Sequence, residues 1–154
     1  MLPVKKIITT TDFSEAARKG VDAAAELAHT FDADLLLVHV SQPLQTAPAA
    51  TAAAGYHLPT VDREIRKEAS QLADELVASA VPDAVRSQVR ILEGKPAQEI
   101  ADLAAKEGAD LIVIATRGEA TWKKVLFGSV AEAVVRHAEC PVLTVPATEA
   151  SDAS

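Results

Sequence analysis

The chain of 154 residues has 49% hydrophobic but only 3% aromatic side chains, and its formal net charge is −7. This length is typical of one domain, predicted here at residues 1–146, with residues 147–154 as a polar, flexible tail. Negative charge and few rings argue against nucleic-acid binding, and no apolar run approaches the roughly 20 residues of a membrane span. Without a signal-peptide core at its start, the chain is expected in the cytoplasm.

Short apolar runs alternate with segments of helical periodicity. The runs that predict strands are Lys6–Thr10, Leu35–Val40, Ser87–Leu92, Leu111–Ala115 and Val142–Val145. A first helix is predicted between the first two strands, with one apolar face made of Ala17, Val21, Ala24, Ala28 and Phe31. Later helices are predicted from Ile65 to Ala80, from Pro96 to a stop at Gly108, and from Ser129 to His137.

Between the second strand and the second helix, the segment from Ser41 to Val61 is rich in Ala, Thr and Pro and has no steady period, which predicts a mobile loop. The Leu35–Val40 strand is continuous rather than alternating in polarity, as expected of a central strand covered on both faces. The alternating order predicts an α/β fold, an open doubly wound sheet of five parallel strands with helices on both faces.

Ligands of such sheets bind beyond the carboxyl ends of the strands, where the winding direction reverses. Asp12 follows the first strand, and its carboxylate can accept hydrogen bonds from both hydroxyls of a ribose. The alternative is local turn chemistry, with Asp12 or Ser14 capping the first helix. Ser14 is the favoured cap, which would free Asp12 for a ligand.

A second candidate site follows the fourth strand and opens the last helix. Glycine-bearing turns at these two places expose backbone N–H groups that can surround phosphate oxygens, and the helix dipole favours an anion there. The residues of this predicted phosphate cradle are Ala115, Thr116, Arg117, Gly118, Gly128, Ser129 and Val130. The alternative is that Gly128 is an ordinary loop residue before a helix capped by Ser129.

Several separated motifs together resemble the universal stress protein family over about residues 4 to 146. They are Thr11–Ala17, Val38-His39-Val40, Gly94-Lys95-Pro96, Gly118-x9-Gly128-Ser129, and Cys140-Pro141-Val142. The resemblance implies a Rossmann-like fold of the adenine nucleotide alpha hydrolase type, a homodimer formed through the strand at Val142–Val145, and a cytoplasmic role in the stress response. Nucleotide-binding members of that family carry G-x2-G-x9-G-S/T and hold ATP, with or without Mg²⁺.

The resemblance also implies roles for individual residues. Asp12 matches the ribose-binding acid, Val40 the residue whose backbone meets the adenine, and Gly118, Gly128 and Ser129 the phosphate-binding positions. The first glycine of the family pattern is Ala115 here. Its methyl group would block a ligand if the position needs a positive φ, and would be harmless in ordinary strand geometry.

The sequence therefore predicts an ATP-binding regulatory or stress-protective protein; the alternative is a dimeric adaptor that binds no nucleotide. We expect no enzymatic activity beyond slow ATP hydrolysis, because no set of groups to orient water and stabilise a leaving phosphate is recognisable. Cys140, the only cysteine, is expected to be an inert buried thiol. None of the four histidines shows metal-ligand spacing.

Overall fold

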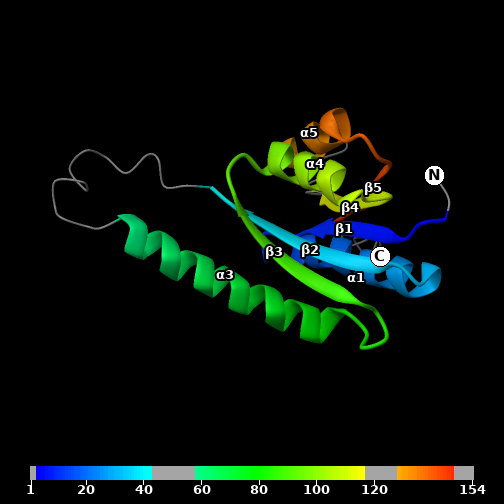
Figure 1. The fold of residues 1–154 in the computed structure, drawn as a ribbon, viewed down its shortest axis with the longest axis horizontal. Coiled ribbons are helices and arrows are strands. Elements are labelled where there is room, and N and C mark those ends of the chain that lie inside the picture. Colours follow the sequence, from blue (N-terminus) through cyan, green and yellow to red (C-terminus); the bar gives the residue numbers. More distant parts are fainter. Residues whose placement is uncertain (1–2, 43–57, 117–127, 148–154) are drawn as a thin grey trace, which may run out of the picture.

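The computed structural model describes residues 3–42, 58–116 and 128–147, which form alternating strands and helices (Figure 1). In chain order the elements are β1 (Lys6–Thr10), α1 (Glu15–Phe31), β2 (Asp34–Ser41), α3 (Leu58–Ala80), β3 (Ser87–Glu93), α4 (Pro96–Glu107), β4 (Leu111–Thr116), α5 (Ser129–His137) and β5 (Val142–Pro146). No helix in these described ranges is both long enough and apolar enough to cross a membrane.

The five strands form one parallel sheet in the order β3-β2-β1-β4-β5. From β1 the chain winds outward through β2 to β3, and then returns to the other side of β1 to form β4 and β5. The winding direction therefore reverses between β1 and β4. This confirms the predicted doubly wound sheet, with β1 in the middle and β2 beside it.

Helices cover both faces of the sheet (Figure 1). On one face, α1 and α3 pack through Val21, Ala24 and Ala73 against β-strand side chains such as Leu37. On the other face, α4 and α5 pack through side chains that include Ile100 and Val134. Central strands lose contact with water on both faces, and each fully buried Ile, Leu or Val contributes about 1.5–3 kcal/mol of transfer free energy.

Local signals set most of the helix boundaries. The Ser14 side chain accepts a hydrogen bond from the Ala17 amide at 3.1 Å and caps α1, as predicted. Pro96 lies in the first turn of α4, and Gly108 ends that helix with a left-handed φ of 63°, also as predicted. Phe31 is the exception, because it is 41% exposed rather than on the buried face of α1. It is the last helical residue before the left-handed cap Asp32, where the chain turns toward β2.

The predicted loop from Ser41 to Val61 is wrong at both ends. Ser41 belongs to β2, since it pairs with Glu93 and its carbonyl accepts a hydrogen bond from the Gly94 amide at 3.0 Å. At the other end, α3 already begins at Leu58. Cross-strand pairing extends β2 beyond its apolar run, and residues 43–57 lie outside the described ranges.

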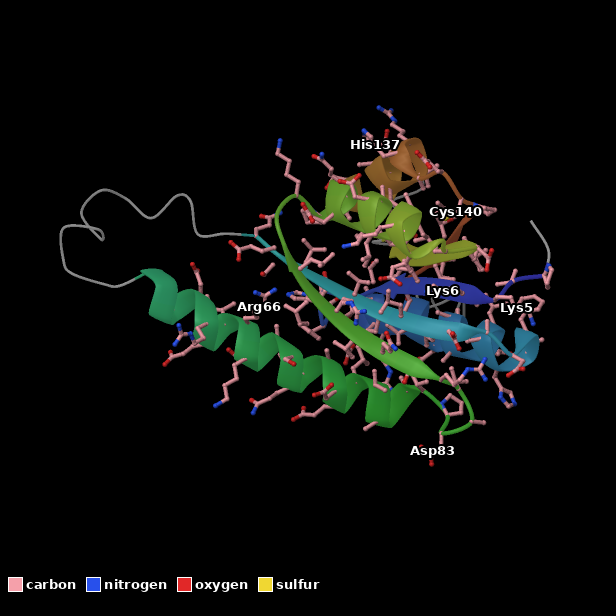
Figure 2. The ribbon with its side chains drawn as sticks, viewed as in Figure 1. Lys5, Lys6, Arg66, Asp83, His137 and Cys140 are labelled. Carbon is pink, nitrogen blue, oxygen red and sulfur yellow. The ribbon has the colours of Figure 1, made fainter. Side chains whose placement is uncertain are left out.

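At the amino ends of the strands, β1 is tied to the chain about a hundred residues later. The amides of Lys5 and Lys6 both donate to Oδ2 of Asp110, at 2.8 and 2.9 Å (Figure 2 shows both lysines). The Lys6 ammonium contacts Glu107 at 3.0 Å and lowers the pKa of that carboxyl. Because the pKa of Glu107 is lowered in the folded state, this contribution to stability is lost as the pH falls through that pKa.

One buried polar group in β1 has an expected stability cost. Thr9 is 0% exposed, and its hydroxyl makes no hydrogen bond within the described structure. Valine has nearly the same shape and removes the unsatisfied hydroxyl. Thr9→Val is therefore expected to raise the free energy of unfolding by about 1 kcal/mol, measured by urea denaturation. Thr10→Val, at the partly exposed next position of β1, is the control; an equal gain there would assign the effect to strand propensity.

Candidate functional site

The candidate site lies at the carboxyl ends of β1 and β4, which are neighbours in the sheet. Their register pairs Ile7 with Leu111 and Thr9 with Val113, so the two strands end side by side. The winding direction reverses at this point, which is where open α/β sheets bind ligands. The segment after β1 carries Asp12, and the chain returns from β4 to open α5 at Gly128 and Ser129.

The turn after β1 is held by a set of local hydrogen bonds. The Thr11 amide donates to the Val38 carbonyl at 3.0 Å, and the Thr11 hydroxyl accepts from the Phe13 amide at 2.9 Å. Oδ1 of Asp12 accepts from the Ser14 amide at 2.9 Å and from the Ser14 hydroxyl. Asp12 is exposed, and the turn presents its carboxylate at the end of β1.

These contacts correct one expectation. Ser14 caps α1, but this does not free Asp12, because the two side chains are bonded to each other. The turn chemistry expected as the alternative for Asp12 is therefore present. One oxygen of the carboxylate orders the turn, and that order fixes where the carboxylate points.

His39, which the sequence analysis named only within the Val38-His39-Val40 motif and without a role of its own, lies next to the candidate site. Its Nδ1 lies 2.8 Å from the Thr11 carbonyl oxygen, and its ring contacts the Phe13 ring in a tilted arrangement with centroids 4.6 Å apart. A carbonyl oxygen only accepts, so Nδ1 carries the hydrogen in this contact. Phe13 has a positive φ of 66°, a conformation that costs a non-glycine residue energy. The contact between the two rings and the histidine hydrogen bond hold that strained turn in place. The sequence feature that could have indicated this role is a histidine near the end of an otherwise apolar strand.

The structure brings Val40 and Val130 to one cluster of side chains. Val40 ends the apolar run of β2, and Val130 is in the first turn of α5. Both pack against the core that includes Ile8, Val38 and Ile114. The predicted adenine position and the predicted phosphate position therefore lie over the same face of the sheet, 90 residues apart in the sequence.

The amino end of α5 differs from the expected capping arrangement. The N-cap residue is Gly128, whose carbonyl accepts from the Glu132 amide at 3.0 Å, and Ser129 is the first helical residue. The alternative in which Ser129 caps the helix is therefore wrong. A glycine cap has no side chain to bond the first amides of the helix, whereas Ser14 does so in α1. An anion is the natural partner for such amides.

Ala115 has ordinary strand geometry. It lies within β4, pairs with Val145 of β5, and is not among the described residues with positive φ. Its methyl group packs under Gly20 of α1, where an added Cβ at position 20 would lie 2.9 Å from the Ala115 nitrogen and 3.2 Å from its Cβ. The methyl group therefore points toward the face covered by α1, away from the face covered by α5.

The remaining predicted residues divide between the sheet and the part not described. Thr116 ends β4, and its hydroxyl donates to the Val145 carbonyl at 3.4 Å. Arg117 and Gly118 lie outside the described residues. Within the described residues, no group of three or more His, Cys, Asp and Glu side chains is arranged to hold a metal. Cys140 is only partly buried rather than fully buried as expected, and this burial raises the pKa of its thiol, which favours the protonated form.

A family model, similar sequences and similar solved structures all relate this chain to the same group of proteins. The model of the universal stress protein family matches residues 3–146. Universal stress protein MJ0531 of Methanocaldococcus jannaschii is 33% identical over 141 residues, covering 92% of this chain and 81% of that protein. The solved structure of hypothetical protein MJ0577 has a TM-score of 0.73 and 25% identity, covering 96% of this chain and 99% of that one. A universal stress protein solved in complex with cAMP has a TM-score of 0.63 and 26% identity, covering 94% and 98%.

Proposed function

The chain belongs to the universal stress protein family, and on that premise we propose that it binds ATP at the carboxyl ends of β1 and β4. The observation that supports this most is that Asp12 follows β1 where the winding direction reverses beside β4, while a glycine caps the start of α5, a helix that packs on the same sheet. The relative solved with cAMP binds an adenine nucleotide on the same fold.

Each residue has a defined task in the proposed complex. Asp12 accepts the ribose hydroxyls, and the backbone of Val40 meets the adenine. The amides of Gly128, Ser129 and Val130 bind phosphate oxygens, together with the segment from Ala115 to Gly118. Because the Ala115 methyl points toward Gly20, it leaves the α5 side of β4 to the phosphates.

The proposed role is regulatory or stress-protective binding in the cytoplasm rather than catalysis. Backbone amides and one carboxylate hold a nucleotide without supplying a group that activates water. Bound ATP, with or without Mg²⁺, stabilises the folded state by mass action and so couples nucleotide level to the surface that partners meet.

Equilibrium titration of the purified chain with fluorescently labelled ATP tests the proposal. The expected result is saturable binding that unlabelled ATP displaces, both with and without Mg²⁺. If no saturable signal is seen at millimolar nucleotide, the proposal is contradicted. The alternative function, a dimeric adaptor that binds no nucleotide, then remains. The titration is done after denaturation and refolding, so that nucleotide carried through purification does not mask the site.

We further propose that the protein is a homodimer formed through β5. This strand is at one edge of the sheet, and Leu143 on it is 42% exposed. Pairing two such edges across a twofold axis satisfies the open peptide groups and buries apolar surface. Sedimentation at micromolar concentration is expected to give twice the monomer mass, and Leu143→Lys is expected to give the monomer. A monomeric parent protein contradicts this assembly.

A further inference from the structure

The opposite edge of the sheet, β3, differs in character from β5. The Arg86 carbonyl accepts from the Leu35 amide at 2.8 Å and the Leu92 carbonyl accepts from the Ser41 hydroxyl at 3.2 Å, so even-numbered carbonyls face β2. Peptide groups alternate in direction along a strand, so those of Val89 and Ile91 face outward. Among the described residues no strand pairs with this side of β3, which thus offers an open strand edge.

A groove of about 860 Å³ runs along this outer edge, between β3 and α3. Five consecutive β3 residues, 87–91, line one side of it, and one side of α3 lines the other. Figure 2 shows Arg66 between the two elements. Lining residues from both faces of the strand mean that the groove follows the edge itself, where the outward peptide groups are.

The charges that line the groove are mostly positive. Arg66, Lys67 and Arg90 are cationic and Asp74 is anionic, in a chain whose formal net charge is −7. Two of these cations already contact the open edge. Arg66 donates to the Ile91 carbonyl at 3.0 Å, and Arg90 donates to the Val89 carbonyl at 3.4 Å. All four side chains are on exposed residues.

We propose that this groove, the residues of α3 and β3 named above, binds an extended acidic peptide segment of a partner protein by strand addition to β3. Backbone pairing with Val89 and Ile91 supplies the affinity, while acidic side chains on the peptide pair with Arg66, Lys67 and Arg90. The arginines would exchange a carbonyl partner for a carboxylate, which is the stronger acceptor for a guanidinium.

The charge pattern favours this occupant over two others. A second copy of the chain docked through the same edge would place two positive grooves against each other, whereas the β5 edge is apolar. A nucleic acid would meet the same cations, but an acidic chain of this composition repels it outside the groove. The proposal is independent of nucleotide binding, since none of these side chains is in the ATP site.

Fluorescence anisotropy with synthetic octapeptides tests the proposal. The probe is a fluorescently labelled octapeptide in which Glu and Val alternate. The matched controls, which carry the same fluorophore, are an octapeptide in which Lys and Val alternate and an oligothymidylate. Preferential binding of the Glu-Val peptide, weakened by salt, is the expected result. Equal binding of the Lys-Val peptide, tighter binding of the oligothymidylate, or no binding of the Glu-Val peptide at millimolar concentration would each overturn the proposal.

Two charge reversals locate the site. Arg66→Glu and Arg90→Glu are each expected to weaken Glu-Val binding about tenfold. Arg63→Glu, the same change on an exposed α3 residue that does not line the groove, is expected to leave binding unchanged. Amide hydrogen exchange should slow at Val89 and Ile91 when the peptide is bound. Unchanged exchange there, or equal weakening by Arg63→Glu, overturns the assignment to β3, and circular dichroism confirms that each variant is folded.

Discussion

Replacing Asp12 by alanine is expected to weaken ATP binding by roughly ten- to a hundredfold, because hydrogen bonds to a charged group contribute about 1.5–3 kcal/mol. The carboxylate is the only acidic side chain that the turn after β1 presents beside β4 among the described residues. Without it, the ribose hydroxyls exchange protein contacts for water. Titration with labelled ATP measures the change directly.

Asp12 also orders its own turn, so the experiment needs a variant that separates the two roles. Asp12→Asn keeps an oxygen that can accept from the Ser14 amide, but it removes the charge. It is expected to retain the stability of the parent protein and to bind ATP more tightly than Asp12→Ala but more weakly than the parent. Asp83→Ala, in the exposed turn between α3 and β3, is the surface control (Figure 2). Unchanged affinity in Asp12→Ala would remove this residue from the site.

Replacing Gly20 by valine is expected to lower the free energy of unfolding by about 3 kcal/mol, because the new side chain meets the backbone of β4. Even a single Cβ at this position would lie 2.9 Å from the Ala115 nitrogen, a backbone atom that moves only with its strand. The helix and strand must therefore separate where β4 reaches the candidate phosphate site. Urea denaturation measures the stability loss.

Smaller changes at the same contact act as controls. Gly20→Ala is expected to cost less than valine, because alanine favours a helix over glycine by about 1 kcal/mol and offsets part of the clash. Adding Ala115→Gly to Gly20→Ala relieves the contact between the two Cβ positions but not the one with the backbone nitrogen. Partial recovery is therefore expected in the double variant. If Gly20→Val is as stable as the parent, α1 does not pack this closely on β4.

Strong local signals in the sequence predicted most of the fold. The apolar runs predicted all five strands, and helix-length segments between them required parallel pairing. Ser14, Pro96 and Gly108 marked helix ends through their own chemistry, which is why those positions were predicted correctly. The limits of the segment from Ser41 to Val61 were not, since pairing with Glu93 extends β2 beyond its apolar residues.

The candidate site was less accessible from sequence. Motif positions identified Asp12, Gly128 and Ser129, but not the bond between Asp12 and Ser14. His39 was read as one residue of a strand, because its partner Thr11 is 28 positions away. Gly20 was not singled out, although a glycine in the middle of a helix signals close packing.

The sequence by itself determined the order of elements, the parallel sheet and the family, since periodicity, end signals and motifs are local and survive without coordinates. Only the tertiary structure decided that the Ala115 methyl group faces Gly20, that His39 supports the turn bearing Asp12, and that the two sheet edges differ in charge and apolar exposure. The physical reason is that such contacts join residues far apart in the chain. Their geometry is set by how helices pack on the sheet, which no local pattern records.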